Sequence, residues 1–380
     1  MNQVRAIDIR LLGKKRTGDE TVFFNLTKEL LAFDREHEYL LLTDESDTKT
    51  LTEIRDRLGC AEQKNVRLVT LRGRNRFIWN LFTVPWFLLR QPVALYHTQY
   101  ILPLFVPRRT KVVLHIHDVS FRAFPKLIGW RDRFFLSLFI PHALRRATAI
   151  VTPSRFTKDE LVRYYRSAPE KITVIPNALS EDFLVDENTT REKIREKYHL
   201  PERFILNVGT LQPRKNLPLL IRALARVRTR LPDVALVLTG NREGHHIDPD
   251  ISRAITELGL SNAVHFAGYV EQRDLPGLVR AATLFAFPSW YEGFGIPLLE
   301  AMSQNVPIVC SDTPCLREVA RDAALYFDPA SIASCEESLY TLLTDETRRG
   351  EKILRGKNRL MSYSWQKSAE LLSRLYDALV

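Results

Sequence analysis

The residues with the clearest chemical potential lie in one short stretch, Tyr291–Met302. Two glutamates, Glu292 and Glu300, flank a turn that contains glycines. Proline is well tolerated in the first turn of a helix, so a helix is predicted to begin near Pro297. The free N–H groups and the positive dipole end of such a helix suit a phosphate or a polar sugar. Both carboxylates could accept hydrogen bonds from the vicinal hydroxyls of a sugar in the same crevice.

A basic pair and a histidine are further candidates, each with an ordinary alternative. Arg214 and Lys215 are adjacent at a turn, where such a pair is usually solvated. In a closed cleft the same cations would stabilise negative charge that develops during a reaction. His117 follows an apolar run, where a histidine is more often structural, and Asp118 could simply cap a turn.

Short apolar runs that alternate with helical patterns must position these residues. Strands are predicted at 4–9, 39–42, 66–71, 94–97, 112–116, 149–151 and 172–175, and again, after a polar stretch, at 204–208, 235–238, 264–266, 284–286, 308–310 and 324–327. Several runs are continuously apolar, which is typical of parallel strands covered on both faces. The pattern predicts two doubly wound sheets, whose ligands bind beyond the carboxyl ends of the strands. The cleft between two such domains is the expected site.

Length and composition agree with this division. The chain has 380 residues, too many for one ordinary core, and 45% of them are hydrophobic and 26% charged, as in globular proteins. Four cysteines are too few for a disulfide scaffold and indicate reduced thiols in the cytoplasm. No export signal or membrane-spanning segment is expected.

Positive charge is concentrated in the first half. Residues 1–175 hold 30 Lys and Arg against 18 Asp and Glu, whereas the remainder holds 25 against 27. Two stretches, 72–90 and 126–146, combine arginines with aromatic and aliphatic residues. Such stretches suit helices that lie on an anionic membrane surface, although amphipathic core helices with basic edges would look the same. The charge also allows nucleic acid as a partner, but no nucleic-acid-binding module is present.

The stretch 291–302 resembles the Glu-x7-Glu motif of the family-4 retaining glycosyltransferases, which have the GT-B fold of two Rossmann-like domains facing across a cleft. Other segments similar to this family are 117–118, 154–158, 174–177, 208–216, 266–270 and 364–365. The matches cover most of the chain and are more specific in its second half. The resemblance implies an acceptor-binding domain at 1–178, a nucleotide-sugar-binding domain at 179–362, and a C-terminal helix at 363–380 that returns to the first domain.

The resemblance also implies a role for each matching residue. Arg214 and Lys215 would neutralise the donor diphosphate. Glu292 would contact the hydroxyls of the transferred sugar, Glu300 would hold the ribose, and His117 would line the cleft near the reacting carbon. The remaining expected donor contacts are Gly18, Gly209, Tyr269, Gly293, Phe294 and Gly295. Gly18 is chosen from two candidate turns, 12–15 and 17–20, neither of which has the usual glycine pair of the family.

The family's chemistry implies a reaction that needs no metal ion and no cofactor. His245 and His246 beside Asp248 and Asp250 could suggest a metal site, but they fall in a polar loop, so none is expected. Attack on the same face as the leaving phosphate, which takes the acceptor's proton, would explain retention.

The donor and acceptor stay open at this point. The motifs look most like those of the mannosyltransferase branch, which uses GDP-mannose, and UDP-linked glucose, galactose or N-acetylhexosamine is the alternative. The acceptor would be a saccharide or a lipid-linked molecule. A glycoside hydrolase would also use two carboxylates but would not require Arg214 and Lys215. A non-catalytic nucleic-acid-binding protein is the third hypothesis, and it predicts a steep salt dependence for polyanion binding.

Overall fold

The computed structural model describes residues 3–14, 18–73, 75–125, 129–183, 190–241 and 246–380. The chain divides into two compact units. Unit 1 comprises Met1–Arg122, Arg131–Asn177 and Ser364–Val380, and unit 2 comprises Ala123–Trp130 and Ala178–Tyr363. The sequence did not predict that the segment Ala123–Trp130, from the first half of the chain, belongs to unit 2. Several residues of the candidate segments lie outside the described residues, namely Lys15, Thr17, Arg74, Lys126 and His245.

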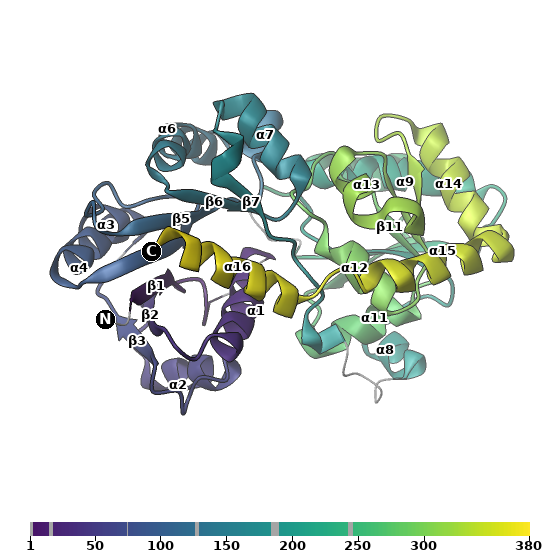
Figure 1. Cartoon of the computed structure of the whole chain (residues 1–380). Coiled ribbons are helices and arrows are strands. Elements are labelled where there is room, and N and C mark those ends of the chain that lie inside the picture. The colour runs from purple at the N-terminus through teal and green to yellow at the C-terminus, as the bar shows by residue number, and fades with distance from the viewer. Residues whose placement is uncertain (1–2, 15–17, 74, 126–128, 184–189, 242–245) are drawn as a thin grey trace. The chain divides into compact units, whose positions relative to one another are not determined.

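Unit 1 contains a parallel sheet in the order β3-β2-β1-β4-β5-β6-β7. Figure 1 labels all of its strands except β4. Its strands are β1 (Val4–Asp8), β2 (Glu38–Thr43), β3 (Val66–Thr70), β4 (Val93–Gln99), β5 (Lys111–His115), β6 (Ala149–Thr152) and β7 (Ile172–Val174). The order reverses between β1 and β4, and the carboxyl ends of these two strands therefore form a switch point where ligands of such sheets bind. All of these strands were predicted from the apolar runs, and that prediction is confirmed.

Helices separate the strands of unit 1. They are α1 (Gly18–Phe33), α2 (Thr48–Arg57), α3 (Arg76–Ile78), the π-helical turn η1 (Trp79–Thr83), α4 (Val84–Arg90), α5 (Ser120–Ala123), α6 (Trp130–Arg146), α7 (Arg155–Tyr165), the 3₁₀ turn η3 (Pro169–Lys171) and α16 (Trp365–Leu379). Short polar side chains cap several of them: Asp47 accepts from the N–H of Thr50, and Ser154 accepts from that of Thr157. No helix in the described part of the chain has both the length and the apolar character needed to cross a bilayer.

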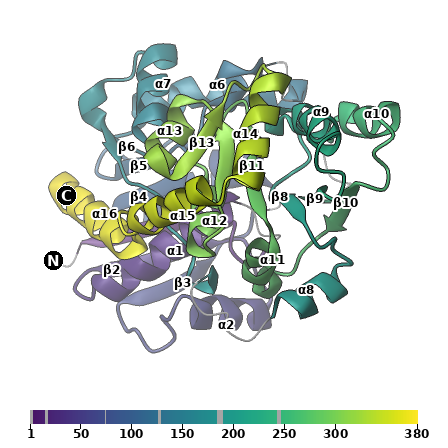
Figure 2. The ribbon, with the colours of Figure 1, turned by 90° about the vertical axis from the view of Figure 1, so that its right-hand side faces the viewer.

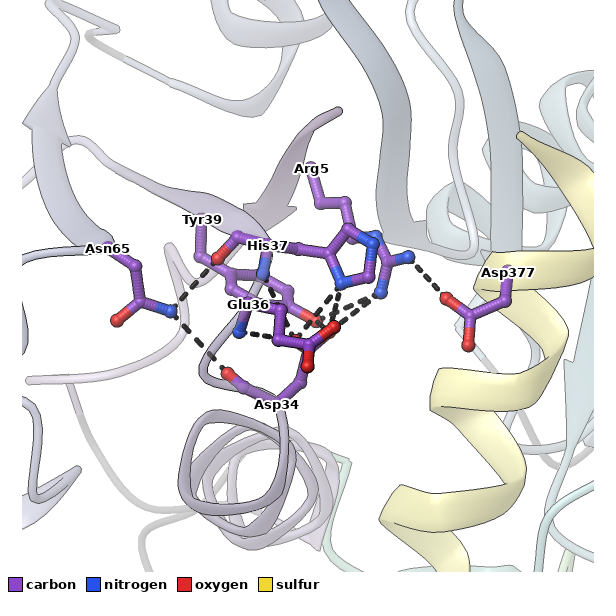
Figure 3. Close-up of polar contacts among 7 residues, drawn as sticks. All are labelled: Arg5, Asp34, Glu36, His37, Tyr39, Asn65 and Asp377. Carbon is purple, nitrogen blue, oxygen red and sulfur yellow. Dashed lines mark hydrogen bonds and ion pairs between the residues drawn. The ribbon is translucent and has the colours of Figure 1, made fainter. Parts of the chain in front are cut away.

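The C-terminal helix α16 packs against α1 although the two lie at opposite ends of the chain (Figure 1). A buried polar group holds it in place (Figure 3). The fully buried guanidinium of Arg5 donates to Asp34 at 2.8 Å and also pairs with Asp377 of α16. Tyr39 donates to the same Asp34 carboxylate at 2.7 Å. The predicted amphipathic helix at 365–379 is thus confirmed, and a charge inside the sheet of unit 1 anchors it.

Unit 2 contains a second parallel sheet in the order β10-β9-β8-β11-β12-β13. Figure 2 labels all of its strands except β12. Its strands are β8 (Phe204–Asn207), β9 (Ala235–Thr239), β10 (Val264–Gly268), β11 (Leu284–Phe287), β12 (Ile308–Ser311) and β13 (Ala324–Phe327). Successive side chains of a strand enter opposite faces, so Ile205 packs in one apolar cluster and Leu206 in another. Both faces are covered, which explains why these runs are apolar throughout.

The helices and turns of unit 2 complete the alternation. They are η4 (Glu181–Phe183), α8 (Arg191–Lys197), η5 (Pro213–Lys215), α9 (Leu217–Arg228), α10 (Pro249–Glu257), η6 (Gln272–Asp274), α11 (Leu275–Ala281), α12 (Ile296–Ser303), α13 (Pro314–Ala320), η7 (Arg321–Ala323), α14 (Ile332–Thr344) and α15 (Glu346–Leu360). The two units are both Rossmann-like, as the sequence predicted.

The buried position of Arg5 gives a stability prediction. Arg5→Met keeps much of the side-chain volume but leaves the buried carboxylate of Asp34 without this cation. We expect it to lower the free energy of unfolding by about 3–5 kcal/mol, as for other broken buried pairs. Arg67→Met, which removes an exposed pair with Glu38 in the same unit, is the control and should cost at most ~1 kcal/mol. Thermal unfolding of the two variants compares them, and equal losses would contradict the anchoring role of Arg5.

Candidate functional site

The predicted basic pair lies on a tight turn at the carboxyl end of β8. Arg214 and Lys215 belong to the 3₁₀ turn η5 (Pro213–Lys215), and Asn216 follows it in the left-handed conformation, with φ of 54°. Asparagine tolerates this conformation better than most residues. Its amide also donates to the carbonyl of Pro329 at 2.9 Å. The turn is therefore fixed on both sides and presents its two cations together.

The predicted glutamate stretch follows β11. It forms an irregular turn that ends at Gly295, where φ is 97°, and α12 starts at Ile296 with Pro297 in its first turn. A helix start near Pro297 was predicted and is confirmed. A side chain at Gly295 would be strained by this φ and would approach Leu316 to 3.1 Å. Phe294 is buried beneath the turn, where its carbonyl accepts from the thiol of Cys315 at 3.4 Å.

These two turns meet through one carboxylate. Lys215 Nζ donates to Glu292 Oε1 at 2.5 Å, and Arg214 donates from a guanidinium nitrogen to Glu292 Oε2 at 3.1 Å. Backbone contacts add to this, because the N–H of Trp290 donates to the carbonyl of Arg214 at 2.9 Å. We call Arg214, Lys215 and Glu292 the charged triad. The sequence assigned its members to one site but did not predict that they contact each other.

The charged triad is largely withdrawn from solvent. The exposed fraction is 7% for Lys215 and 8% for Glu292. Burial alone would raise the pKa of Glu292, but the positive charges of Lys215 and Arg214, with the hydrogen bond from Lys215, outweigh it and lower that pKa to about 2. Lys215 Nζ also lies 4.9 Å from the centre of the Phe287 ring. Glu292 is therefore ionised throughout the physiological pH range, and the triad carries a net positive charge.

The other predicted donor residues of unit 2 are placed around this triad to different degrees. Gly209 follows β8, and a Cβ atom there would lie 3.6 Å from Lys215 Cε, so the glycine is directly beside the lysine. Gly293 adjoins Glu292 in the chain, and Glu300 is half-buried inside α12. Tyr269 follows β10, and its side chain is 71% exposed. The structure thus brings Gly209 to the triad and leaves Tyr269 on the surface.

The two predicted site residues of unit 1 lie close to each other. His117 follows β5, its Nε2 is 2.9 Å from Gln99 Oε1, and its Nδ1 is 4.0 Å from Asp19 Oδ1. Asp19 directly follows Gly18 in the first turn of α1. Asp118 accepts from the N–H and hydroxyl of Ser120 at 2.9 and 2.8 Å, so it caps a turn. That was one of the two interpretations left open for Asp118.

Sequence reasoning missed the histidines that support His117. The rings of His115 and His117 stack with centroids 4.4 Å apart, and His97 stacks on His115 at 5.8 Å. Burial, and then repulsion by His117, lowers the pKa of His97 to about 3 and that of His115 as well. Both rings are neutral at physiological pH. The signal was present in the sequence, because His97 and His115 lie in neighbouring predicted strands, but neither residue follows a recognisable motif.

No group of three or more His, Cys, Asp or Glu side chains within the described residues is arranged to hold a metal ion. His245 lies outside those residues. Asp248 instead caps α10 by accepting from the N–H of Asp250 at 3.0 Å.

Solved structures with the same fold define the class of the protein. Sucrose-phosphate synthase from Thermosynechococcus elongatus matches with a TM-score of 0.75 at 18% identity, over 100% of this chain and 99% of that one. Anabaena HepE in complex with UDP and glucose matches with a TM-score of 0.74 at 16% identity, over 99% and 100%. Together with the two Rossmann-like units, these likenesses establish the GT-B fold.

The sequence comparisons identify the family. Residues 16–183 match "Glycosyltransferase Family 4", and residues 190–359 match "Glycosyl transferases group 1". O-antigen chain mannosyltransferase B of Escherichia coli is 31% identical over 281 residues, which are 72% of this chain and 72% of that protein. The chain belongs to glycosyltransferase family 4 and is a glycosyltransferase, as the motifs predicted.

The pKa of Glu292 gives a pH prediction. Because this pKa is about 2 in the folded protein and 4.5 ordinarily, the ionised carboxylate stabilises the native state fully above about pH 5. That contribution, roughly 3 kcal/mol, is lost as the pH falls toward 2. The difference in unfolding free energy between the wild type and Glu292→Gln should therefore shrink on acidification.

Urea denaturation from about pH 6 to about pH 3 measures this difference. Glu257→Gln, which changes an exposed carboxylate on α10, is the control and should show little pH-dependent difference from the wild type. If the difference in unfolding free energy between the wild type and Glu292→Gln stays constant with pH, the carboxylate is not stabilised by the two cations.

Proposed function

We propose that this enzyme transfers a hexose, mannose from GDP-mannose, to a hydroxyl of a saccharide or lipid-linked acceptor, with retention of configuration and without a metal ion. The observation that carries the proposal is the buried charged triad at the carboxyl ends of β8 and β11. Two cations in a site shielded from water stabilise charge on a leaving group far more than they would in solvent. The mannosyltransferase relative supports mannose as the sugar.

In the proposed reaction the bond between the anomeric carbon and the diphosphate oxygen breaks, and its electron pair stays on the diphosphate. The acceptor oxygen forms the new bond on the same face of the sugar, and its proton passes to the departing phosphate. Arg214 and Lys215 would stabilise the diphosphate as its charge develops. Glu292 would orient Lys215 through their hydrogen bond and would also accept a hydrogen bond from a sugar hydroxyl. His117, in unit 1, would contact the sugar near the reacting carbon.

A UDP-linked hexose, namely glucose, galactose or N-acetylhexosamine, is the second candidate donor. The observation that favours it is the likeness to HepE, whose structure was solved in complex with UDP and glucose. The same triad would serve either donor, because both carry a diphosphate. The two candidates differ only in the base and the sugar.

We further propose that the enzyme works in the cytoplasm and associates with an anionic membrane surface through unit 1. Phe82, Trp86 and Phe134 support this, since their side chains are 68%, 56% and 69% exposed. Trp79 has a different role: it is completely buried and donates to Asp8 at 2.9 Å. The basic aromatic stretch thus combines a core-facing side with an exposed apolar side, and only the exposed side could contact lipid headgroups.

Release of nucleoside diphosphate from a panel of sugar nucleotides tests the donor. In the presence of a saccharide mixture, we expect GDP-mannose to be turned over fastest, because the relative at 31% identity is a mannosyltransferase. Turnover should persist in EDTA, because diphosphate stabilisation is assigned to Arg214 and Lys215 rather than to a metal. Faster turnover of a UDP-sugar would reverse the donor assignment. Activity that is absent with EDTA and restored by Mn²⁺ would overturn metal independence.

Lys215→Ala removes the buried cation of the triad. Turnover should fall by well over ~10-fold, since the charge it stabilises is greatest in the transition state, and the loss should appear mainly in kcat. Lys193→Ala, at an exposed position on α8 of the same unit, is the control and should retain normal kinetics. Steady-state kinetics with a saturating donor make the comparison, and normal turnover of Lys215→Ala would reject the diphosphate role.

A further inference from the structure

The surface of unit 1 carries an open apolar groove of about 810 Å³, formed by Leu71 and Arg72 after β3, by η1 and α4, and by Phe105. This volume is within the ~300–1,000 Å³ of ordinary small-molecule sites. Its lining is mostly aromatic and aliphatic, with Arg72 and Arg90 among the polar contributors. The groove lies entirely within unit 1 and contains none of the residues assigned to sugar transfer.

The side chains that line the groove are unusually exposed for apolar residues. Phe82 is 68% exposed, Trp86 56%, Phe105 50% and Leu89 48%. A contiguous apolar patch of this kind usually marks a binding surface. Isolated apolar residues are common on protein surfaces, but these four share one groove.

The groove is held in shape by buried contacts. Trp79, at the start of η1, is fully buried, and its indole nitrogen donates to Asp8 at the end of β1. The N–H of Leu104 donates to the carbonyl of Asn80 at 3.2 Å, which ties the segment around Phe105 to η1. At the other end, Arg109 donates to the carbonyl of Leu89 at 2.9 Å. The groove is therefore built into the unit.

The charge around the groove is positive. No Asp or Glu occurs from residue 63 to residue 117, a stretch that holds nine Lys and Arg. Arg90 lies over the ring of Trp86 at 4.0 Å, so its stem and guanidinium extend along the apolar wall. An occupant with an anionic group at one end of an apolar body would match both properties.

The lining of the groove adjoins, in the chain, a residue at the end of the sheet where His117 lies, because Leu81 of the groove follows Asn80. Asn80, which follows Trp79, lines a small cavity of about 70 Å³ together with Asp8, Arg10 and Gln99. Gln99 in turn contacts His117 at 2.9 Å. The groove and the strand ends of unit 1 are therefore formed in part by consecutive residues of one short segment.

We propose that this groove binds the hydrocarbon chain of a lipid-linked acceptor, with the phosphate of that lipid beside Arg72 or Arg90. The inference rests on the proposed function, since it names the acceptor of the same reaction. A peptide segment would fit less well, because only four of the twelve lining residues, Arg72, Thr83, Arg90 and Gln91, have polar side chains that could bond its backbone, and unpaired amides are costly. A single hydrocarbon chain has no such requirement.

Binding of a long-chain alkyl phosphate with a mid-chain bromine tests the proposal, because bromine quenches the fluorescence of nearby tryptophans such as Trp86. The full chain is titrated with the probe below its micelle concentration. We expect saturable quenching, weakened ~10-fold or more in the double variant Phe82→Ser and Leu89→Ser. Phe33→Ser, at an exposed phenylalanine of α1 outside the groove, is the matched control and should bind normally.

Two comparisons distinguish a phosphate-linked chain in the groove from a different ligand and from docking on a bulk membrane. A trimethylammonium probe with the same chain should bind more weakly, and the double variant Arg72→Gln and Arg90→Gln should reduce this preference for phosphate. Equal binding of both heads by the wild type would overturn the phosphate-linked occupant. Vesicles of anionic phospholipid form the second comparison. Binding to vesicles without saturable binding of the monomeric probe would show bulk surface docking and overturn the groove assignment.

The release of nucleoside diphosphate is measured separately, so failure of the proposed function would not be mistaken for failure of lipid binding.

Discussion

Unit 2 of this enzyme depends on one buried electrostatic arrangement, the pairing of Glu292 with Lys215 and Arg214. A carboxylate or ammonium removed from water is very costly unless an opposite charge compensates it. Here each charge is retained in a site that is almost closed to solvent only because its partner is present. The pairing also joins the turn after β8 to the turn after β11, strands that are neighbours in the sheet. The charged triad can therefore form only because the sheet places β8 beside β11.

This dependence explains which features the sequence could predict. Local patterns predicted the strands, because a strand that is buried on both faces of a sheet is apolar along its whole length. They also predicted the start of α12, because proline is favoured in the first turn of a helix and Pro297 occupies that position. The pairing of Glu292 with Lys215 follows instead from the neighbouring positions of β8 and β11, which a crossover brings together across 77 positions of the chain. The burial of Trp79 was unpredictable for a similar reason. It depends on Asp8, a residue of another strand.

The corresponding end of the sheet in unit 1 has a different electrostatic character. Where unit 2 has the charged triad, unit 1 has stacked histidines, two of which burial keeps neutral. Neutral imidazole can donate and accept hydrogen bonds without attracting an anion. This contrast agrees with the proposal that unit 2 holds a diphosphate and unit 1 an acceptor whose reacting group is an uncharged hydroxyl.

The basic aromatic stretch of unit 1 connects these assignments to the acceptor. One short segment buries Trp79 against Asp8 and exposes Phe82 and Trp86 a turn or two later. A helix with an ordinary core-facing stripe would place polar side chains at the exposed positions. Exposed rings in a segment that the sheet holds firmly lose little conformational entropy when they are covered, so they favour binding of an apolar partner. The residue that anchors the segment, Trp79, donates to Asp8 at the end of β1, so a buried hydrogen bond ties the segment that lines the groove to the strand ends of unit 1.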